Sequence, residues 1–400
     1  MVYSHDTFGL GNIRRMLAVS NHLLGAIPGV SVLLVTGSPM IQEFRIRPGL
    51  DYIKLPCLSR TGRGEYSAKS LGTGIDRLLQ LRSGLILAAA RDFAPDVVLI
   101  DKKPDGVKHE LRHTLDFLKH SRPHCRIGLV LRDILDCPAS TITSWHEGGY
   151  FNTLRQYFDG VLVLGDPTVF DAAAEYRFPE DIRSMTSYCG YIRHHAPASR
   201  DTSLQRARFL VNGEKHLVLV TPGGGEDGFA LVRCYAEGSA KLRSTRSVIV
   251  CGPEMPASQR ESIAQIVARD ASVSVAEFTG EMLGHMAAAD CVVSMAGYNT
   301  MCEVLSLRKG SVTCPRVHPV QEQWIRGERL STLGLTEAIH PGALTPDNLM
   351  RAVSTRLDSN RTAAFPASLD GLDNIAAWIR ESALPVAKTA PLGRLAWNAV

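Results

Sequence analysis

Short runs of hydrophobic residues alternate along the chain with longer segments whose hydrophobic residues recur at helical spacing. In the first half, the short runs that predict buried strands are residues 32–35, 97–100, 127–131 and 161–164. Residues 13–24 and 78–93 carry apolar side chains three or four positions apart, which is typical of helices that pack one face against a sheet. This alternation of strand and helix predicts a parallel sheet with helices on both faces.

The second half shows the same alternation, without any internal repeat of the sequence. Its predicted strands are residues 217–220, 247–250, 272–276, 291–294 and 310–314. A polar, basic stretch separates the halves, and it sets the predicted boundaries: a first domain over 1–195, a linker over 196–212, a second domain over 213–365, and a C-terminal helix and tail over 366–400. The sequence therefore predicts an α/β protein with two doubly wound, Rossmann-like domains that face a central cleft.

Residues 57–74 interrupt the pattern of the first half, because they contain four glycines and few apolar residues. We expect a long mobile loop there. Such loops often lie over binding clefts, but a plain surface excursion would have the same composition.

Composition excludes several classes of protein. With 400 residues, 45% hydrophobic and 21% charged, the chain has the composition of a globular protein long enough for two domains. The net charge of +4 is too small to predict a nucleic-acid partner. Nine scattered cysteines without a Cys-x-x-Cys pair predict reduced core thiols and no metal site. Because the sequence shows neither a long apolar run nor a signal-peptide pattern, we expect a cytoplasmic location.

The stretch HLVLVTPGGGEDG, residues 216–228, combines a predicted strand, a glycine-rich turn and the start of a helical pattern. Consecutive glycines at 223–225 would let backbone N–H groups approach a ligand closely, and the following helix N-terminus favours negative charge. The turn is therefore a candidate cradle for a diphosphate, although a tight turn without a ligand would look the same. It lacks the Gly-Lys-Ser/Thr of a P-loop, which argues against nucleoside triphosphate hydrolysis.

A second turn of this kind lies in the stretch CVVSMAGYNTMCEVLSL, residues 291–307. Asn299 and Thr300 are residue types that favour the start of a helix. Glu303 follows about one helical turn later, where a carboxylate can accept hydrogen bonds from both hydroxyls of a ribose. It would equally serve as a charge that complements the helix dipole. Further along, Glu322 and Gln323 are polar groups able to bind sugar hydroxyls.

Together these motifs resemble the nucleotide-binding domain of GT-B glycosyltransferases, especially the MurG-like and UDP-glucuronosyltransferase-like groups. The matching elements are the turn 222–228, the EFTGEM stretch 277–282, the turn and helix 297–303, and Gln323. The first half is similar to a group of predicted bacterial glycosyltransferases, through YSHDTFGLG at 3–11, IDKKP at 100–104 and LRDILD at 131–136. The resemblance covers most of residues 1–340.

The resemblance implies a GT-B enzyme that transfers a sugar from a nucleoside diphosphate with inversion and without a metal or other cofactor. A UDP-sugar is the expected donor, with GDP and dTDP as alternatives, and the first domain would hold an unidentified small-molecule, glycan or lipid-linked acceptor. Thr279 and Met282 would border the nucleobase, and Glu303 would hold the ribose. The phosphates would lie on the two turns, at Gly223, Gly224, Gly225, Gly297, Tyr298, Asn299 and Thr300. Glu322 and Gln323 would face the donor sugar.

Transfer to a hydroxyl needs a group that accepts its proton and positive charge that stabilises the departing diphosphate. His5 and Asp6 are the leading candidates for the proton acceptor, because they follow the first predicted strand at its cleft end. Either could instead be structural, His5 as a hydrogen-bonding partner within the glycine-rich opening and Asp6 as a cap. The other residues expected on the acceptor side of the cleft are Gly9, Gly11, Asn12, Asp101, Arg132 and Asp133.

Asn12 departs from the similar bacterial group, whose opening runs Gly-Leu-Gly-His. An amide cannot take a proton, so a base role at this place is in doubt. This departure keeps open a non-catalytic nucleotide-sugar-binding protein. A nucleotide-sugar 2-epimerase is a second alternative, because it shares the architecture but needs no acceptor. Asp101 and Asp133 stay alternative proton acceptors, and Arg132 would stabilise the diphosphate.

Residues 108–126 contain nine lysine, arginine or histidine side chains. This segment would suit an anionic lipid or a phosphorylated acceptor. Because Glu110 and Asp116 interrupt it, the alternative is a solvated helix face. A peripheral contact with the inner membrane is thus one of two interpretations.

Overall fold

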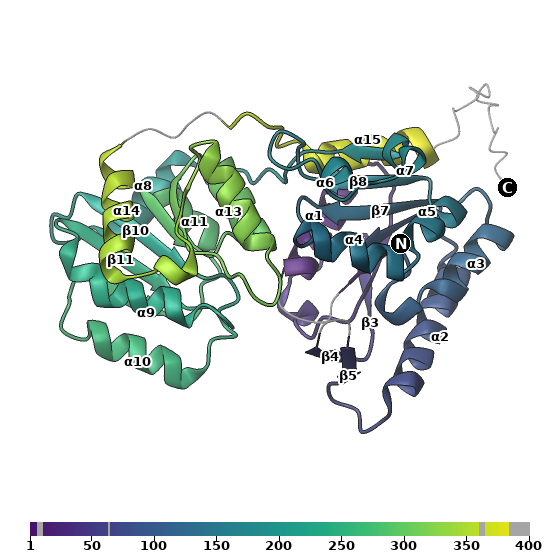
Figure 1. The fold of residues 1–400 in the computed structure, drawn as a ribbon, viewed down its shortest axis with the longest axis horizontal. Helices are drawn as coiled ribbons and strands as arrows, with labels where there is room; N and C mark the ends of the chain where they lie inside the picture. The colour runs from purple at the N-terminus through teal and green to yellow at the C-terminus, as the bar shows by residue number, and fades with distance from the viewer. Residues whose placement is uncertain (6–10, 63–64, 360–364, 384–400) are drawn as a thin grey trace, which may run out of the picture.

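The computed structural model describes residues 1–5, 11–62, 65–359 and 365–383, so Asp6 and Gly9 lie outside the described residues. The chain forms two α/β halves that lie side by side, each built on its own sheet (Figure 1). The N-terminus lies in the first half, and the last described helix, α15 over Gly371–Ala383, returns to the same half.

The first sheet consists of seven parallel strands in the order β3-β2-β1-β6-β7-β8-β9. Their bounds are β1 Val2–Ser4, β2 Val32–Thr36, β3 Leu50–Lys54, β6 Val97–Asp101, β7 Arg126–Arg132, β8 Gly160–Leu164 and β9 Thr186–Tyr188. The chain runs from β1 outward to β3 and later places β6 on the other side of β1. This reversal puts a switch point between β1 and β6, where doubly wound sheets bind ligands.

The second sheet consists of six parallel strands in the order β12-β11-β10-β13-β14-β15. Their bounds are β10 His216–Thr221, β11 Thr245–Val250, β12 Val273–Ala276, β13 Cys291–Ser294, β14 Gly310–Thr313 and β15 Glu337–Ala338. Its switch point lies between β10 and β13 for the same reason. Both predicted nucleotide-binding turns therefore start at the carboxyl ends of the two central strands.

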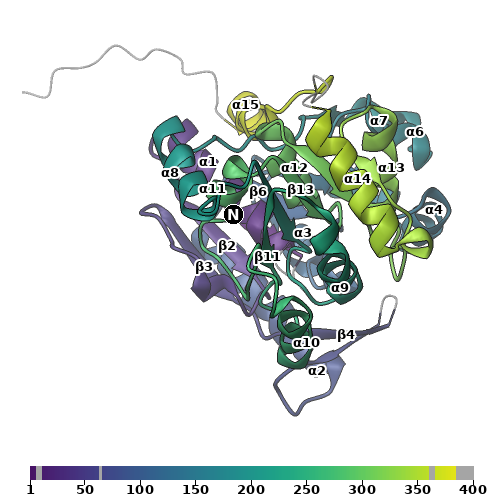
Figure 2. The same cartoon turned by 90° about the vertical axis from the view of Figure 1, so that its left-hand side faces the viewer.

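Helices cover both faces of each sheet. Those of the first half are α1 Gly11–Ala26, α2 Ile75–Phe93, α3 Arg112–Ser121, α4 Pro138–Glu147, α5 Tyr150–Tyr157, α6 Ala172–Glu175 and α7 Glu180–Ser184. Those that follow are α8 Ser199–Phe209, α9 Phe229–Gly238, α10 Ala257–Val267, α11 Met282–Ala288, α12 Tyr298–Ser306, α13 Glu322–Thr332 and α14 Pro346–Asp358. Figure 2 looks onto the second half, with α9, α10 and α14 on one side and α8, α11 and α12 on the other. Within the described ranges, every helix is too short or too polar to cross a membrane.

Side chains alternate between the two faces of the first sheet, as strand geometry requires. Val2 and Leu99 belong to the buried cluster next to α1 and α15, whereas Tyr3 and Ile100 belong to the cluster on the opposite face. The cluster next to α1 continues into the second half, where it includes Met301 of α12. A shared hydrophobic core therefore joins the two halves on this side.

Helix α15 packs against the first sheet through Trp378. A Cβ added to Gly128 or Gly160 would approach the indole ring to 3.1 and 2.9 Å. These two strand positions therefore exclude larger side chains, because the ring already fills the space above them.

The structure confirms the predicted fold class, and all nine predicted strands are present within two residues of their expected ends. The predicted linker 196–212 contains helix α8, which packs against α11 of the second half. All nine cysteines are free thiols, and seven are buried, as the scattered positions predicted.

The predicted loop 57–74 is wrong over its first part. Residues there form an antiparallel hairpin of β4, Leu58–Gly62, and β5, Glu65–Ala68. Leu58 is buried in a small cluster with Leu78 and Val107, and Tyr66 and Ala68 of β5 pack against this cluster. The prediction failed because a two-stranded hairpin needs few buried residues, and the glycines dominated the composition.

Candidate functional site

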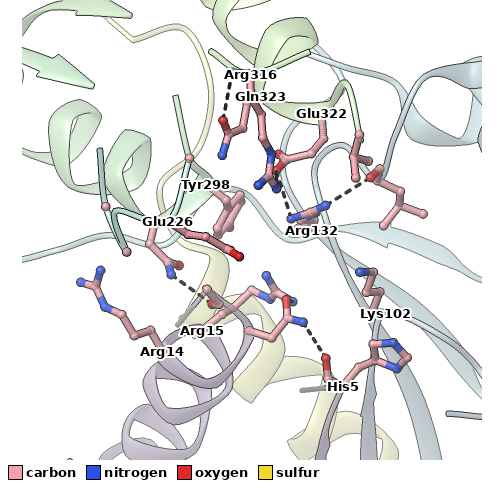
Figure 3. A pocket seen from close by; sticks show the side chains of 18 of the residues that line it. His5, Arg14, Arg15, Lys102, Arg132, Glu226, Tyr298, Arg316, Glu322 and Gln323 are labelled. Carbon is pink, nitrogen blue, oxygen red and sulfur yellow. Dashed lines mark hydrogen bonds and ion pairs between the residues drawn. The ribbon is translucent and has the colours of Figure 1, made fainter. Parts of the chain in front are cut away.

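A cleft of about 1830 Å³ lies between the two halves and is lined by residues of both. Figure 3 shows side chains from the two halves pointing toward one another across it. The predicted residues that line it are His5, Gly11, Asn12, Arg132, Gly223, Gly224, Gly225, Thr279, Met282, Gly297, Tyr298, Asn299, Thr300, Glu303, Glu322 and Gln323. The cleft thus brings together segments that are far apart in the sequence, at the switch points of both sheets.

The N-terminus of α12 opens into this cleft directly after β13. Ala296 has a left-handed backbone, with φ of 54°, and its carbonyl oxygen accepts a hydrogen bond of 2.8 Å from Arg326 Nη1. Gly297 caps the helix in an extended conformation. Arg326 therefore supports a strained turn whose first N–H groups face the cleft, an arrangement that suits a bound anion. Asn299 Nδ2 donates to Gly11 O of the first half at 3.0 Å.

Glu303 lies one turn inside α12 and is buried, with only 3% of its side chain exposed. Its Oε1 atom is 2.5 Å from Arg14 Nη2 of the first half. Its Oε2 atom is buried and has no hydrogen-bond partner among the residues that the structure describes. A buried carboxylate oxygen without a partner is costly, unless a ligand supplies the missing donor.

The glycine-rich turn after β10 has the backbone that its sequence predicted. Gly223 and Gly225 have φ of +88° and +98°, and a Cβ at Gly225 would lie 2.4 Å from Cys251 O. The backbone N–H of Glu254 donates to Gly224 O at 2.8 Å, which ties the turn to the segment after β11. Glycine is required here by both conformation and space.

Acidic side chains surround this glycine-rich turn. A Cβ at Gly224 would lie 2.4 Å from Glu254 Oε2, so that carboxylate rests against the turn. Burial raises the pKa of Glu226, and the charges of Glu254 and Asp227 raise it further. Burial likewise raises the pKa of Glu254. Acidic side chains thus lie against the glycine-rich turn, in contrast to the α12 N-terminus.

Glu322 lies at the start of α13, where three arginines surround its carboxylate. Oε2 is 2.7 Å from Arg326 Nη1, and Oε1 is 3.5 Å from Arg132 Nη1 and 3.9 Å from Arg316 Nη2. Burial alone would raise the pKa of Glu322, but Arg132, Arg326 and Arg316 outweigh it and lower the pKa to about 2. Figure 3 shows Glu322 and Arg132 facing each other. These ion pairs hold the Glu322 carboxylate in place at the edge of the cleft, and its predicted contact with the donor sugar stays a prediction.

Gln323, the next residue of α13, lines the cleft beside Arg316. Its Oε1 accepts a hydrogen bond of 3.3 Å from the Arg316 backbone N–H. This contact orients the side chain and leaves its amide nitrogen as the group that could bind a sugar hydroxyl.

Two residues expected in the cleft do not line it. Asp101 is fully buried, and its Oδ1 lies 2.5 Å from Arg15 Nη2. Asp133 is buried as well and pairs with Arg326. Both acids end strands as predicted, but arginines bind their carboxylates below the surface of the cleft. Neither is therefore placed to accept a proton from an acceptor.

His5 follows β1 and lines the cleft, where it is 1% exposed. Its backbone N–H donates to Asp101 Oδ2 at 3.2 Å, and its carbonyl accepts from Asn12 Nδ2 at 2.6 Å. Asn12 Oδ1 in turn accepts from Arg15 Nη2 at 3.1 Å. Asn12 thus braces the backbone of His5, a role that an amide fills with both its donor and its acceptor.

The first half contributes a basic wall to the cleft. Lys102, Lys103 and Lys108 line it on the segment after β6. Lys102, Lys108 and His109 have left-handed backbones, with φ of 68°, 48° and 65°. Non-glycine residues adopt this conformation at a cost, and such strain is concentrated at functional sites.

Sequence reasoning missed several residues that shape the site: Arg14, Glu226, Glu254, Arg316 and Arg326. Arg326 had one local signal, because it stands four positions after Glu322, the spacing of an ion pair on one helix face. Glu226 lies within the glycine-rich stretch 216–228, but nothing in that motif singles out its side chain. Arg14 pairs with Glu303 and Arg316 with Asp227, partners that are distant in the sequence.

The match to a known protein family lies in the second half of the chain. Residues 217–371 match the sequence model of the glycosyltransferase family 28 C-terminal domain. One relative is the UDP-N-acetylglucosamine--N-acetylmuramyl-(pentapeptide) pyrophosphoryl-undecaprenol N-acetylglucosamine transferase of Lachnoclostridium phytofermentans. It is 33% identical over 89 residues, which cover 22% of this chain and 25% of that protein. An uncharacterized glycosyltransferase of Methanopyrus kandleri is 26% identical over 243 residues, which cover 58% of this chain and 66% of that protein. The chain thus matches less than two thirds of the length of either relative.

Solved structures extend the likeness to the whole fold. MurG of Acinetobacter baumannii superposes with a TM-score of 0.58 at 14% identity, covering 95% of this chain and 98% of that one. The glycosyltransferase SnogD from Streptomyces nogalater gives a TM-score of 0.60 at 16% identity, covering 96% and 98%. The two sheets and the cleft between them therefore define a protein of the GT-B glycosyltransferase fold. Within this fold, residues 217–371 of the second half match the glycosyltransferase family 28 C-terminal domain.

Proposed function

We propose that the protein transfers a sugar from a nucleoside diphosphate, with UDP-sugars as the first choice, to an acceptor hydroxyl held by the first half. The observation that carries this proposal is Glu303. Its buried carboxylate lines the cleft one helical turn from the α12 N-terminus, and its Oε2 has no hydrogen-bond partner in the described part of the chain. That spacing suits a ribose on Glu303 and phosphates on the first N–H groups of α12.

The surrounding residues support the rest of a donor site. Thr279 and Met282 line the cleft at the start of α11, where they would border the base. Gln323 would bind the sugar. The N-terminus of α12 supplies positive charge for the departing diphosphate, so that the proposed reaction proceeds without a metal ion.

His5 is the proposed proton acceptor, because it directly follows β1 and lines the cleft. In the proposed reaction, the acceptor oxygen attacks the anomeric carbon as the bond to the diphosphate breaks, and the hydroxyl proton passes to His5. Attack opposite the leaving group inverts the anomeric centre.

The basic wall favours an acceptor that carries negative charge. Lys102, Lys103 and Lys108 lie on the first half, whereas the acidic rim of Glu226 and Glu254 lies on the second. The Lachnoclostridium relative is named for a pyrophosphoryl-undecaprenol acceptor, a lipid-linked diphosphate. We therefore propose an anionic acceptor, which a lipid-linked diphosphate would satisfy.

We further propose that the outer face of α2 and α3 contacts an anionic membrane surface. Leu81, Leu85 and Phe93 of α2 expose 48%, 38% and 37% of their surface. The basic residues of α3 and the turn after it, such as Lys119, lie on the neighbouring helix. Exposed leucines beside lysines and arginines suit the headgroup region of a bilayer.

The test of the transferase uses UDP-sugars with and without candidate acceptors. Product formed only with an acceptor supports transfer. An epimerised sugar nucleotide formed without acceptor would favour the 2-epimerase, and binding without turnover would favour a non-catalytic binding protein.

Donor-site placement is tested separately by the Glu303→Ala variant. Loss of the ribose hydrogen bonds should weaken UDP binding by about 1–3 kcal/mol. Glu328→Ala is the matched control, because Glu328 lies exposed on α13. Unchanged UDP affinity in Glu303→Ala would refute the assignment.

A further inference from the structure

Arg14 and Glu303 form an ion pair that crosses the cleft. Arg14 Nη2 of α1 lies 2.5 Å from Glu303 Oε1 of α12, and 36% of the Arg14 side chain is exposed while Glu303 is 3% exposed. The glutamate is therefore fixed in the second half, whereas the arginine reaches it from the first half through the solvent-facing cleft.

This pair conflicts with the proposed donor site, on which the present inference rests. A ribose presents two neighbouring hydroxyls, and a carboxylate that binds both must use both oxygens. Oε2 of Glu303 has no partner within the described structure, but Oε1 is already taken by Arg14. A nucleoside that uses both oxygens therefore competes with the Arg14 guanidinium for Oε1.

The displaced guanidinium has a specific place to go. The other arginines lining the cleft each pair with a carboxylate elsewhere: Arg15 with Asp101, Arg132 with Glu322, and Arg316 with Asp227. Among the described residues, Glu303 is the only carboxylate within ion-pair distance of Arg14. Once a ribose occupies Glu303, Arg14 is a long cationic side chain without a counter-charge, close to the start of α12.

The geometry of the two helix starts directs Arg14 toward the donor phosphates. Asn299 at the start of α12 is hydrogen-bonded to Gly11 at the start of α1, so the two N-termini lie against each other. Arg14 lies one turn along α1 and lines the same cleft as Gly297 and Thr300. The acidic rim of the glycine-rich turn leaves this side as the favourable place for a diphosphate.

We propose that Arg14 is a ligand of the donor diphosphate and exchanges partners when the donor binds. The ribose hydroxyls take Glu303, and the freed guanidinium binds phosphate oxygens, for which its planar, charged donors are well matched. In the transfer step, Arg14 neutralises charge on the departing diphosphate. A nucleoside without phosphates displaces Arg14 and gives it no new partner, so the exchange also selects for the diphosphate.

The test compares the affinities of uridine, UMP and UDP for the wild type and for Arg14→Ala by titration calorimetry. The exchange predicts that Arg14→Ala weakens UDP binding at least tenfold, while uridine binds equally well or a few-fold more tightly. Arg14→Lys keeps the positive charge but lacks the planar guanidinium with its paired N–H donors, so it should recover only part of the UDP affinity. Arg77→Ala, on exposed α2 outside the cleft, is the matched control and should leave all three affinities unchanged.

Other results overturn the inference. An equal loss of uridine and UDP affinity would mean that Arg14 only supports the fold of the site. An equal gain of uridine and UDP affinity in Arg14→Ala would mean that Arg14 only competes with the ribose for Glu303. If the wild type binds neither UDP nor GDP nor dTDP, the proposed function itself is refuted. This result is distinct from a failure of the exchange, because it concerns the wild type alone and not the Arg14 variants.

Discussion

Asp133 and Arg326 form a bidentate ion pair that joins the two halves of the protein. Arg326 Nε lies 2.7 Å from Asp133 Oδ2, and Nη2 lies 2.7 Å from Oδ1. Both side chains are fully buried. The same guanidinium donates to the carbonyl of Ala296 before α12, so the contact between the halves and the shape of the proposed donor turn depend on one side chain.

The Asp133→Asn substitution should destabilise the protein strongly, because it leaves the buried Arg326 without its main counter-charge. Breaking one side of a buried ion pair costs about 3–5 kcal/mol. Urea unfolding followed by tryptophan fluorescence measures the change.

Glu175→Gln provides the control for this experiment. Glu175 and Arg329 also connect the two halves at 2.7 Å, but their side chains are 33% and 47% exposed. Solvent screening limits such a pair to about 1 kcal/mol or less. Equal losses in the two variants would show that burial of the Asp133 pair has no special effect.

Glu322 should make stability depend on acid pH. Its folded-state pKa is about 2 against an ordinary value of 4.5, because three arginines outweigh its burial. A lowered folded-state pKa contributes stability above pH 4.5, and that contribution is lost as the pH falls toward 2. Its size is up to about 3 kcal/mol.

The Glu322→Gln variant cannot ionise at this position and isolates the effect. The difference in unfolding free energy between wild type and variant should be largest near neutral pH and should shrink as the pH falls below 4.5. Urea titrations at a series of pH values measure it. A difference that stays constant over this range would contradict a lowered pKa.

The strands were predictable from the sequence because buried parallel strands require continuous apolar runs. A run such as 161–164, which is flanked by Gly160 and Gly165, is too short for a helix and therefore indicates a buried strand. The hairpin over 58–68 could not be found this way, because Leu58 is its only fully buried apolar side chain with a described environment. The short strand β15 has two residues and no pattern at all.

The two strand-to-helix turns were predictable because their signals are local: glycines and the start of a helix follow one another in the chain. Their role in donor binding stays a prediction. The charge pairs that complete the site are not local. Arg14 and Glu303 are 289 positions apart, and Asp133 and Arg326 are 193 positions apart. Only the packing of the two halves brings them together, so the sequence identified Glu303 but gave no reason to select Arg14.

The proposed membrane face predicts binding to anionic vesicles. Replacing both Leu81 and Leu85 by Gln removes apolar surface that would be buried in the bilayer, and should weaken binding by about tenfold or more. Co-sedimentation with vesicles that contain phosphatidylglycerol measures it, with phosphatidylcholine vesicles for comparison.

Leu204→Gln is the matched control for the membrane face. Leu204 is 52% exposed on α8, outside the α2 and α3 face. If the wild type fails to bind either vesicle, or if Leu204→Gln reduces binding as much as the double variant, the proposed face is wrong.

His5→Gln should abolish most turnover while leaving the donor site intact. The substitution keeps a polar side chain at the end of β1 but removes the imidazole that would accept the hydroxyl proton, and loss of a general base costs about 100-fold or more in kcat. UDP affinity should not change, because Glu303 and α12 hold the donor on the other half of the cleft. His113→Gln, at an exposed position of α3, controls for histidine replacement as such. Full turnover by His5→Gln would move the proton acceptor elsewhere in the cleft, with Glu226 next to be tested because burial raises its pKa.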